Sequence, residues 1–260
     1  MNCKLCLQPS APYDRATVLM KHVVQYYQCS SCGFIQTEEP HWLDEAYASP
    51  INLSDIGLVG RNVAFSKVTQ AVIGAFLKRD QSYLDYGGGY GLFVRLMRDA
   101  GLDFYLYDKH CTNLFARGFE VEAQSEHGFE LVTAFEVFEH LVQPLETIAQ
   151  MLQFSSNILF STSLVPEHNP KLADWWYFGL DHGQHVAFYS YQSLLVIARR
   201  FGLNLMSDGR QLHFLTQKRL PKLAFRVVAS YRTAAVVARL AKKPSLLPQD
   251  YYRITGTPLA

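Results

Sequence analysis

The segment YLDYGGGYG, residues 83–91, is the feature that most restricts what this chain can fold into. It places four glycines within five residues, directly after a short run of bulky side chains. Glycine loses more conformational freedom on folding than any other residue, so such a run indicates that a ligand or another backbone approaches closely. The next residues, YGLFVRLMRDAGL, have apolar side chains at helical spacing. The glycines are therefore predicted to lie on a strand-to-helix turn, where backbone N–H groups can face a ligand.

The spacing of these glycines excludes two common phosphate-binding motifs. The dinucleotide fingerprint G-x-G-x-x-G requires glycine where the chain has Leu92, and no Gly-Lys-Ser/Thr of a phosphate loop follows. The run fits D-x-G-x-G-x-G instead, from Asp85 to Gly91. A second predicted strand ends in Asp108, 21 residues after Gly87. An acid in that place can bind both hydroxyls of a ribose, so the pattern indicates a nucleoside ligand without a pyrophosphate.

Later segments continue the alternation of strands and helices. FELVTAFEVFEHL, residues 129–141, predicts a buried strand, a turn at Glu136 and a helix from about Glu139. SNILFSTSLVP, residues 156–166, predicts another strand that ends at a proline. This rhythm is typical of an α/β fold with a parallel sheet and helices on both of its faces.

Four of the five cysteines are concentrated near the N-terminus as CKLC and CSSC, with 22 residues between the two pairs. Two C-x-x-C pairs at this spacing predict a tetrahedral zinc site, and four thiolates make it structural rather than catalytic. The β-branched and aromatic residues between the pairs predict a hairpin. A redox pair, disulfides, or His22 in place of one ligand are the alternatives, and Cys111 is expected to be a buried apolar residue. The predicted ligands are Cys3, Cys6, Cys29 and Cys32.

Composition and charge give weaker constraints. The formal net charge is +1, which does not indicate a nucleic-acid partner, and we expect a cytoplasmic protein because no signal sequence or long apolar run is present. Residues 211–260 nevertheless carry nine basic side chains and one acid. A long basic helix is expected after Pro221. It could pack on its own domain or on a second copy of the chain, contact an anionic membrane surface, or bind a phosphate group of the substrate.

Together, LDYGGGYG, Asp108 and AFEVFEHL resemble the class I S-adenosylmethionine-dependent methyltransferases, over about residues 61–217. The resemblance implies a Rossmann-like α/β fold with a seven-stranded sheet, ending in a hairpin of LNLMSD and QLHFLTQ. It implies S-adenosylmethionine as cofactor, with adenine contacts near VEAQSE that we leave unassigned. The residues expected at the cofactor are Asp85, Gly87, Gly88, Gly89, Asp108, Ala134, Phe135, Glu136 and His140, of which His140 caps a helix or braces the pocket.

The segment CSSCGFIQTEEPHWLDEAYASP resembles the zinc-ribbon lead-in of a methyltransferase subgroup that acts on sugars in polysaccharide, glycolipid or antibiotic pathways. In that subgroup Tyr47 matches an aromatic residue that covers the active site, and the alternative is a packing residue at a domain junction. The expected organisation is a zinc ribbon at 1–40, a lead-in at 41–80, the methyltransferase domain at 81–217 with a substrate insertion at about 166–189, and a basic C-terminal segment at 218–260.

The insertion holds an aromatic run, Trp175 to Phe178, followed by Asp181, His182 and His185. A hydroxyl acceptor must lose its proton during methyl transfer, and histidine titrates in the right range to accept it. We therefore expect His182 and His185 as candidate bases, with Asp181 to orient them and Tyr47 beside them. The alternative is that these histidines are structural hydrogen-bond partners.

The sequence thus predicts O-methylation of a sugar, a glycan or a nucleotide-sugar intermediate. The alternatives are a sugar C-methyltransferase, a module that binds the cofactor without catalysis, and an RNA-modifying methyltransferase. The expected cofactors are S-adenosylmethionine and structural zinc. The expected partner is a small-molecule or glycan acceptor and not a nucleic acid; peripheral membrane contact through the basic segment and a homodimer stay open.

Overall fold

The computed structural model describes residues 1–48, 55–122, 128–240 and 243–259, and these fall into two units. The first unit comprises residues 1–48, Glu136–Gln150 and Phe160–Arg219. The second comprises residues 55–122, 128–135, Met151–Leu159, 220–240 and 243–259. Each unit is therefore assembled from segments that are distant in the sequence.

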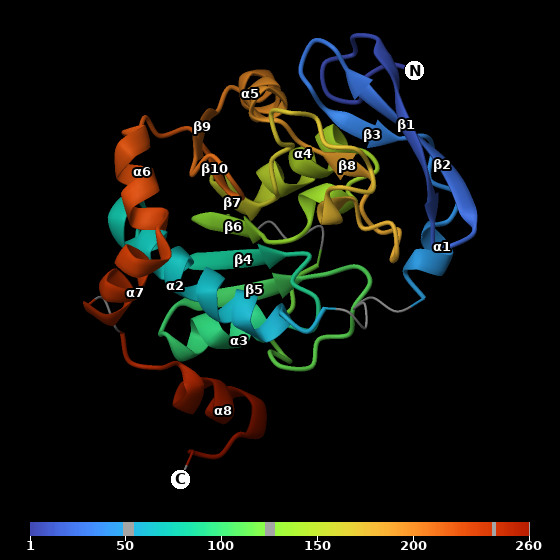
Figure 1. Ribbon diagram of the computed structural model, residues 1–260. Helices are drawn as coiled ribbons and strands as arrows, with labels where there is room; N and C mark the ends of the chain where they lie inside the picture. Colours follow the sequence, from blue (N-terminus) through green and yellow to red (C-terminus); the bar gives the residue numbers. More distant parts are fainter. Residues whose placement is uncertain (49–54, 123–127, 241–242, 260) are drawn as a thin grey trace. The chain divides into compact units, whose positions relative to one another are not determined.

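The first unit contains a four-stranded sheet built around the N-terminal hairpin. Strand β1 (Ser10–Val18) pairs antiparallel with β2 (His22–Cys29), which confirms the predicted hairpin (Figure 1). The tight turn between them places Leu19 and Met20 at φ 51° and 59°. Strand β3 (Ile35–Thr37) pairs with β2 on one side and with β8 (Ala187–Phe188) on the other. The insertion predicted after residue 166 therefore contributes a strand to the sheet of the ribbon.

Apolar side chains from the ribbon and the insertion form one core in the first unit. Tyr26 and Ile35 of the hairpin sheet, Trp42 and Ala46 of the region around helix α1 (Leu43–Ala46), and Phe178 of the insertion are all buried there. The aromatic residues of the insertion differ in exposure at the short helix η2 (Trp176–Phe178). Tyr177 and Phe178 are buried, whereas Trp176 is 79% exposed. Most of this run therefore serves packing.

The remainder of the first unit matches the prediction closely. Helix α5 (Tyr191–Arg200) begins after Ser190, whose hydroxyl accepts the Ser193 N–H at 3.0 Å, as expected of an N-cap. Strands β9 (Asn204–Ser207) and β10 (Leu212–Thr216) pair antiparallel and confirm the terminal hairpin.

The second unit contains the parallel strands that carry the glycine loop. Strand β4 (Ser82–Tyr86) pairs in parallel with β5 (Asp103–Tyr107) and with β6 (Leu131–Ala134). Helices α2 (Leu58–Phe76) and α3 (Leu92–Asp99) contact each other, and α3 contacts β5. The predicted α/β fold with a parallel sheet is confirmed.

In the second unit the strand order is β5-β4-β6, and β7 spans Ile158–Ser161. Seven strands were expected. Among the described residues, an isolated parallel bridge between Leu106 and Glu120 lies beside β5, where a further strand would be added.

The segment after β6 differs from the helix predicted to begin at about Glu139. A short helix η1 (Phe138–His140) comes first. The long helix α4 (Pro144–Phe154) begins five residues after Glu139. Proline favours the first helical position because its ring fixes φ and its missing N–H leaves no donor unsatisfied. Glu139 and His140 are therefore held on a short turn.

The basic C-terminal segment is divided, whereas the sequence indicated one long helix. Helix α6 (Lys222–Ala229) and helix α7 (Tyr231–Leu240) are separated at Ser230, which is extended at ψ 133°. The Ser230 hydroxyl accepts the Thr233 N–H at 3.4 Å and so begins the second helix. Both helices contact α2 (Figure 1), and a last helix α8 (Leu247–Thr255) follows. None of the helices in the described part of the chain is long and apolar enough to cross a membrane.

Candidate active site and metal centre

The four N-terminal cysteines converge in the first unit. The Sγ atoms of Cys3 and Cys32 are 3.7 Å apart, those of Cys6 and Cys29 3.4 Å, and those of Cys6 and Cys32 3.7 Å. A tetrahedral zinc ion with Zn–S bonds of about 2.3 Å requires S–S distances of about 3.8 Å. The cluster therefore fits zinc. His22 is not part of it, because its Nε2 lies 3.0 Å from Glu45 Oε2.

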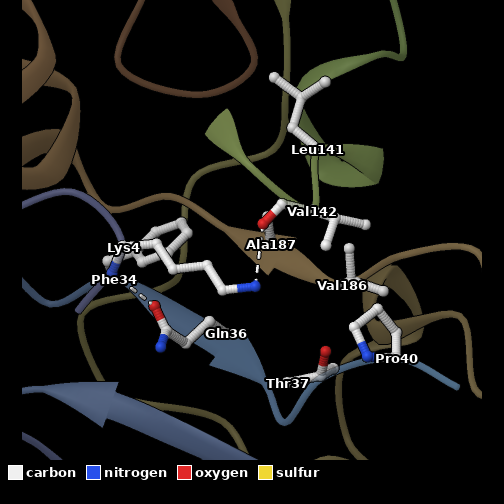
Figure 2. A pocket seen from close by; sticks show the side chains of 9 residues that line it. All are labelled: Lys4, Phe34, Gln36, Thr37, Pro40, Leu141, Val142, Val186 and Ala187. Carbon is white, nitrogen blue, oxygen red and sulfur yellow. Dashed lines mark hydrogen bonds between the residues drawn. The ribbon is translucent and has the colours of Figure 1, made fainter. Parts of the chain in front are cut away.

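The cysteine centre is tied to the turn that carries Glu139 and His140. The Lys4 ammonium group, between Cys3 and Cys6, donates to the Val142 carbonyl at 2.9 Å (Figure 2). The backbone N–H of Lys4 donates to Gln36 Oε1 at 2.9 Å, which fixes the base of this side chain. The fold of the ribbon therefore holds the segment just after η1.

Replacing Cys3 with serine is expected to release the zinc, because three thiolates and one hydroxyl hold it less tightly than four thiolates. Cys111 supplies the matched control, since it lies outside the cluster and lines a cavity in the second unit. Zinc released by a mercurial thiol reagent should fall by about one equivalent per chain in Cys3→Ser and stay at the parent value in Cys111→Ser. If the mercurial reagent liberates as much zinc from purified Cys3→Ser as from the parent protein, the cluster does not bind zinc.

The glycine loop has the backbone conformation that its sequence demands. Gly87, Gly89 and Gly91 have φ values of 71°, 59° and 83°, a region that other residues adopt at a steric cost. Gly88 is required for a different reason, since a Cβ there would lie 2.2 Å from Asp85 Oδ2. The four glycines thus allow the loop to fold tightly over the end of β4.

Asp108 closes this loop. Its Oδ2 accepts the Gly89 N–H at 2.8 Å, while its Oδ1 accepts the N–H groups of His110 and Cys111 at 2.7 and 2.8 Å. Asp108 also lines a cavity of about 340 Å³. The other lining residues are Leu106, Cys111, Thr112, Asn113, Arg117, Glu120 and Val121. Cys111, expected to be buried, is half-buried here.

Asp85 is buried at the end of β4 and accepts a 2.6 Å hydrogen bond from the Thr133 hydroxyl. Burial raises its pKa to about 7, the Thr133 hydrogen bond acts in the opposite direction, and the Asp108 charge adds to the rise. Asp85 and Asp108 therefore lie on either side of the loop, and their roles at a cofactor stay predictions.

Two of the cofactor candidates, Ala134 at the end of β6 and Phe135 directly after it, are packed by neighbouring side chains. Ala134 is fully buried, and the Phe135 ring stacks on Phe65 with centroids 4.2 Å apart and meets Phe93 edge-on. Their roles at a cofactor stay predictions. The segment VEAQSE, near which adenine contacts were expected, lies largely outside the described residues, since 123–127 are not described.

In the first unit, the predicted turn at Glu136 is present with φ 54°. Its N–H donates to Ser161 Oγ at 2.7 Å, and the Ser161 hydroxyl donates to Glu136 Oε1 at 2.6 Å. This reciprocal pair fixes the residue from which the chain enters η1.

Tyr47, His182 and His185, expected together at the acceptor, lie in the first unit together with His140, which was expected at the cofactor. The Tyr47 hydroxyl lies 2.9 Å from His140 Nδ1. The rings of His140 and His185 meet edge-on at 4.9 Å, and those of His182 and His185 at 4.7 Å. Burial lowers the pKa of His140 to about 4 and that of His185 well below its ordinary value. Both imidazoles are therefore neutral at pH 7.

Hydrogen bonds assign the tautomers of these histidines. His185 Nδ1 lies 2.6 Å from the Tyr177 carbonyl, and His140 Nδ1 lies 3.1 Å from the Gln184 carbonyl. Since a carbonyl oxygen only accepts, His185 Nδ1 carries the proton and its Nε2 keeps a lone pair. The Gln184 carbonyl favours the same tautomer for His140, whose Nδ1–H is then shared with the Tyr47 hydroxyl oxygen at 2.9 Å. His182 is the reverse, because its Nδ1 accepts the Gln184 N–H at 3.1 Å. His185 is thus oriented by a backbone carbonyl, while Asp181 is exposed and shows no ion pair with a histidine among the described residues.

Glu139 belongs to the same cluster and was missed as a site residue. It is fully buried, and neither carboxyl oxygen has a hydrogen-bond partner in the part of the chain that the structure describes. Burial and then the charge of Glu136 raise its pKa well above the ordinary value. The hydroxyls of Tyr177 and Thr162 are close enough to oppose this shift, but neither donates a well-formed hydrogen bond. The sequence signal was the acid directly before His140.

The absence of a side chain at Gly179 leaves room for the His182 ring. A Cβ at Gly179 would lie 2.2 Å from His182 Nε2, and its φ is 59°. Gly202 is a matched control with φ 65° and nothing within 4 Å of an added Cβ. Gly179→Ala should cost about 1–3 kcal/mol more stability than Gly202→Ala, and only Gly179→Ala should shift the imidazole NMR signals of His182. Equal unfolding midpoints in urea and unchanged imidazole signals would contradict this packing.

A comparison with protein-family models identifies the domain. Residues 61–208 match the model described as a methyltransferase domain, which is more than half of the chain. The chain belongs to this methyltransferase family. The match includes the glycine loop, Asp108, η1 and the histidine cluster, and it confirms the enzyme class predicted from the sequence. No curated protein matches the chain.

Solved structures similar to this methyltransferase are distant. A magnesium protoporphyrin IX methyltransferase from Synechocystis, solved with SAH, is 15% identical with a TM-score of 0.45, and the alignment covers 68% of this chain and 95% of that one. An O-methyltransferase family 2 protein from Planctomyces limnophilus, solved with apigenin, is 13% identical with a TM-score of 0.46 over 68% and 65%. OxaC, solved with sinefungin and meleagrin, is 17% identical with a TM-score of 0.41 over 53% and 43%, so the chain spans under half of its length. The assignment rests on the family match.

Proposed function

We propose that this methyltransferase uses S-adenosylmethionine to methylate a hydroxyl group of a sugar, a glycan or a nucleotide-sugar intermediate. The choice of cofactor is supported by the glycine loop, which Asp108 closes and which lies beside a cavity of about 340 Å³. A loop of this kind, followed by an acid at the end of the next strand, suits a ribose without a pyrophosphate. Asp108 would bind the ribose hydroxyls, and the backbone around Gly88 would face the methionine end, since the N–H groups of Gly87 and Gly89 already donate to the Tyr107 carbonyl and to Asp108 Oδ2.

The histidine cluster supports a hydroxyl as the acceptor. Methyl transfer is an in-line displacement in which the bond from sulfur to the methyl carbon breaks as the bond from oxygen to carbon forms. The hydroxyl proton must leave, and a positioned base contributes about 10²- to 10⁴-fold to such a step. Of the predicted bases, His185 is favoured over His182 because its Nε2 carries the free lone pair. The hydrogen bond between Tyr47 and His140 braces the same group.

A zinc ribbon ahead of the domain supports the sugar-directed subgroup. The four cysteines fit zinc, and Lys4 joins their turn to the segment that carries Glu139 and His140. The ribbon would therefore stabilise the acceptor side of the enzyme rather than bind RNA. We expect structural zinc and a small-molecule or glycan acceptor.

The test is calorimetric titration of the purified protein with S-adenosylmethionine, S-adenosylhomocysteine and NAD in parallel. Micromolar binding of both adenosyl ligands and none of NAD is the expected result. Asp108→Ala should weaken the binding of both adenosyl ligands, while the zinc content stays at the parent value. Incubation with methyl-labelled cofactor and a panel of nucleotide sugars and glycans should then transfer label to one acceptor. If neither adenosyl ligand shows a heat of binding, the proposal is wrong.

A further inference from the structure

Glu139, His140 and His185 bring three metal-binding groups together outside the cysteine centre. One ligand atom from each lies within 4.8 Å of the other two. Glu139 and His140 come from η1, and His185 comes from the insertion after residue 166. We propose that this cluster, the His2Glu site, binds one divalent transition-metal ion in addition to the zinc of the ribbon. Bonds of about 2.1 Å in a tetrahedral site would place neighbouring ligand atoms about 3.4 Å apart, so side-chain rotations that bring these atoms closer together are needed.

Both histidines are oriented as metal ligands usually are. A metal-binding histidine commonly donates its other ring N–H to a carbonyl or carboxylate, which fixes the ring and its tautomer. His185 donates from Nδ1 to the Tyr177 carbonyl at 2.6 Å, and His140 from Nδ1 to the Gln184 carbonyl at 3.1 Å. The nitrogen left on each ring is therefore Nε2 with its lone pair. A purely structural histidine would gain most by using both nitrogens.

Glu139 is the second, independent observation. Its side chain is 0% exposed, and both carboxyl oxygens lack a hydrogen-bond partner among the described residues. Burial of a polar group without a partner is unfavourable, and burial of an unpaired carboxylate is more so. A divalent cation supplies the missing partner and the missing charge at once. No other buried carboxylate in the described part of the chain lacks partners at both oxygens.

The ligand set indicates the class of metal. Two imidazoles and one carboxylate suit Zn²⁺, Fe²⁺ or Mn²⁺, whereas Mg²⁺ and Ca²⁺ prefer oxygen ligands. Three protein ligands leave coordination positions open, as in catalytic rather than structural sites. His140 and His185 are half-buried, so water or a hydroxyl could complete the coordination.

The role of the cation, unlike its binding, rests on the proposed function. An acceptor hydroxyl bound to the cation would lose its proton more readily, because a metal ion lowers the pKa of oxygen that it binds. The Nε2 of His185 would then hold the metal, and the hydroxyl proton would pass to water at the half-buried side of the site. Metal binding is measured without methyl transfer, so failure of one proposal is distinguishable from failure of the other.

The first test counts metal ions in the full-length protein after reconstitution with Zn²⁺ and, separately, with Co²⁺ under anaerobic conditions. Two ions per chain are expected. The Co²⁺ spectrum should combine the strong thiolate charge-transfer bands of the cysteine centre with the weaker bands of a nitrogen and oxygen site. One ion per chain with a purely thiolate spectrum would overturn the proposal. Because this test uses only the parent protein, it does not depend on whether a variant folds.

The second test compares Glu139→Gln with Glu45→Gln, a matched change at an exposed carboxylate. Glu45 lies in α1 and pairs with Lys21 and His22, away from the His2Glu site. Glu139→Gln should lose the second ion and the weaker Co²⁺ bands while it keeps the thiolate bands, which also report that the ribbon is folded. Glu45→Gln should keep both ions. Retention of two ions in Glu139→Gln would overturn the assignment of Glu139.

Discussion

Gly88→Ala should weaken binding of S-adenosylmethionine by about 10-fold or more, because a loop shift that costs about 1–3 kcal/mol corresponds to about 5- to 150-fold in affinity. A Cβ at Gly88 would lie 2.2 Å from Asp85 Oδ2 and 2.5 Å from Leu106 Cδ1. Asp85 is buried and bonded to Thr133, so its carboxyl group cannot move away freely. The loop must shift instead, and overpacking of this kind costs about 1–3 kcal/mol of stability. Calorimetry with both adenosyl ligands measures the loss.

Gly74→Ala is the matched control for this change. Gly74 lies in α2 of the same unit, and an added Cβ would meet nothing within 4 Å. Alanine in a helix interior is favoured over glycine by about 0.5–1 kcal/mol, so Gly74→Ala should bind cofactor as the parent does. Parent-like affinity in Gly88→Ala would show that the loop does not contact the cofactor.

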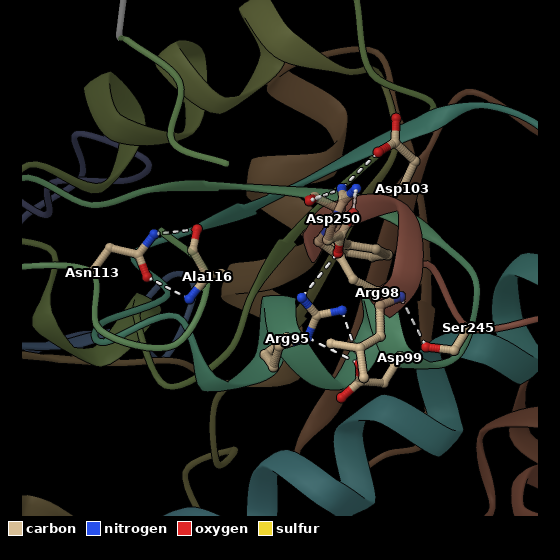
Figure 3. Close-up of polar contacts among 10 residues, drawn as sticks. Arg95, Arg98, Asp99, Asp103, Asn113, Ala116, Ser245 and Asp250 are labelled. Carbon is tan, nitrogen blue, oxygen red and sulfur yellow. Dashed lines mark hydrogen bonds and ion pairs between the residues drawn. The ribbon is translucent and has the colours of Figure 1, made fainter. Parts of the chain in front are cut away.

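Asp250→Ala should lower the free energy of unfolding by about 3–5 kcal/mol, the range seen when one partner of a buried ion pair is removed. Arg98 donates to Asp250 from Nε at 2.9 Å and from Nη2 at 2.7 Å, and Arg95 adds a third bond at 2.9 Å (Figure 3). The Arg98 side chain is 5% exposed and that of Asp250 is 2% exposed. Removal of the carboxylate leaves a buried guanidinium without its main partner, and α8 loses its attachment to α3.

Asp99→Ala is the control, because Asp99 pairs with the same Arg95 but is 44% exposed. A surface pair contributes about 0–1 kcal/mol, so the unfolding midpoint in urea should hardly move. Similar losses in both variants would contradict the buried network.

The same network predicts a pH dependence. Burial acts to raise the pKa of Asp250, but the hydrogen bonds and charge of Arg98 outweigh it, so the pKa lies below its ordinary value. An acid whose pKa is lowered on folding contributes stability above its unfolded pKa, about 3.9 for aspartate. That contribution is lost as the pH falls through the lower folded value. The stability difference between the parent and Asp250→Ala should therefore narrow below about pH 4.

The geometry of the cysteine cluster and of the glycine loop could be predicted from the sequence because both depend on local chemistry. The C-x-x-C pairs at Cys3 and Cys29 needed only spacing, since each turn aims two thiolates at one point. The glycine loop and Asp108 followed from positive φ and from the order of strand, loop and strand. Ser190 was recognised as a helix cap because its hydroxyl serves an N–H only three residues away.

Contacts between distant segments could not be predicted in this way. The pairing of β8 with β3 joins Phe188 to Ile35, and the hydrogen bond from Tyr47 to His140 spans 93 residues. Neither contact leaves a periodic pattern in the sequence, because each depends on where whole segments pack. The division of the basic segment at Ser230 and the start of α4 at Pro144 likewise depended on single side chains that outweighed helical periodicity.

The sequence by itself determined the family, the α/β fold, the cysteine cluster and the glycine loop after the first parallel strand, because each is specified by neighbours along the chain. Only the tertiary structure decided that Glu139 is buried beside His140 and His185 and that Lys4 holds the segment next to them. Burial and the direction of a lone pair depend on the packing of every surrounding segment. The pattern EH in the sequence is therefore compatible with a surface turn, and the fold makes it the centre of a polar cluster.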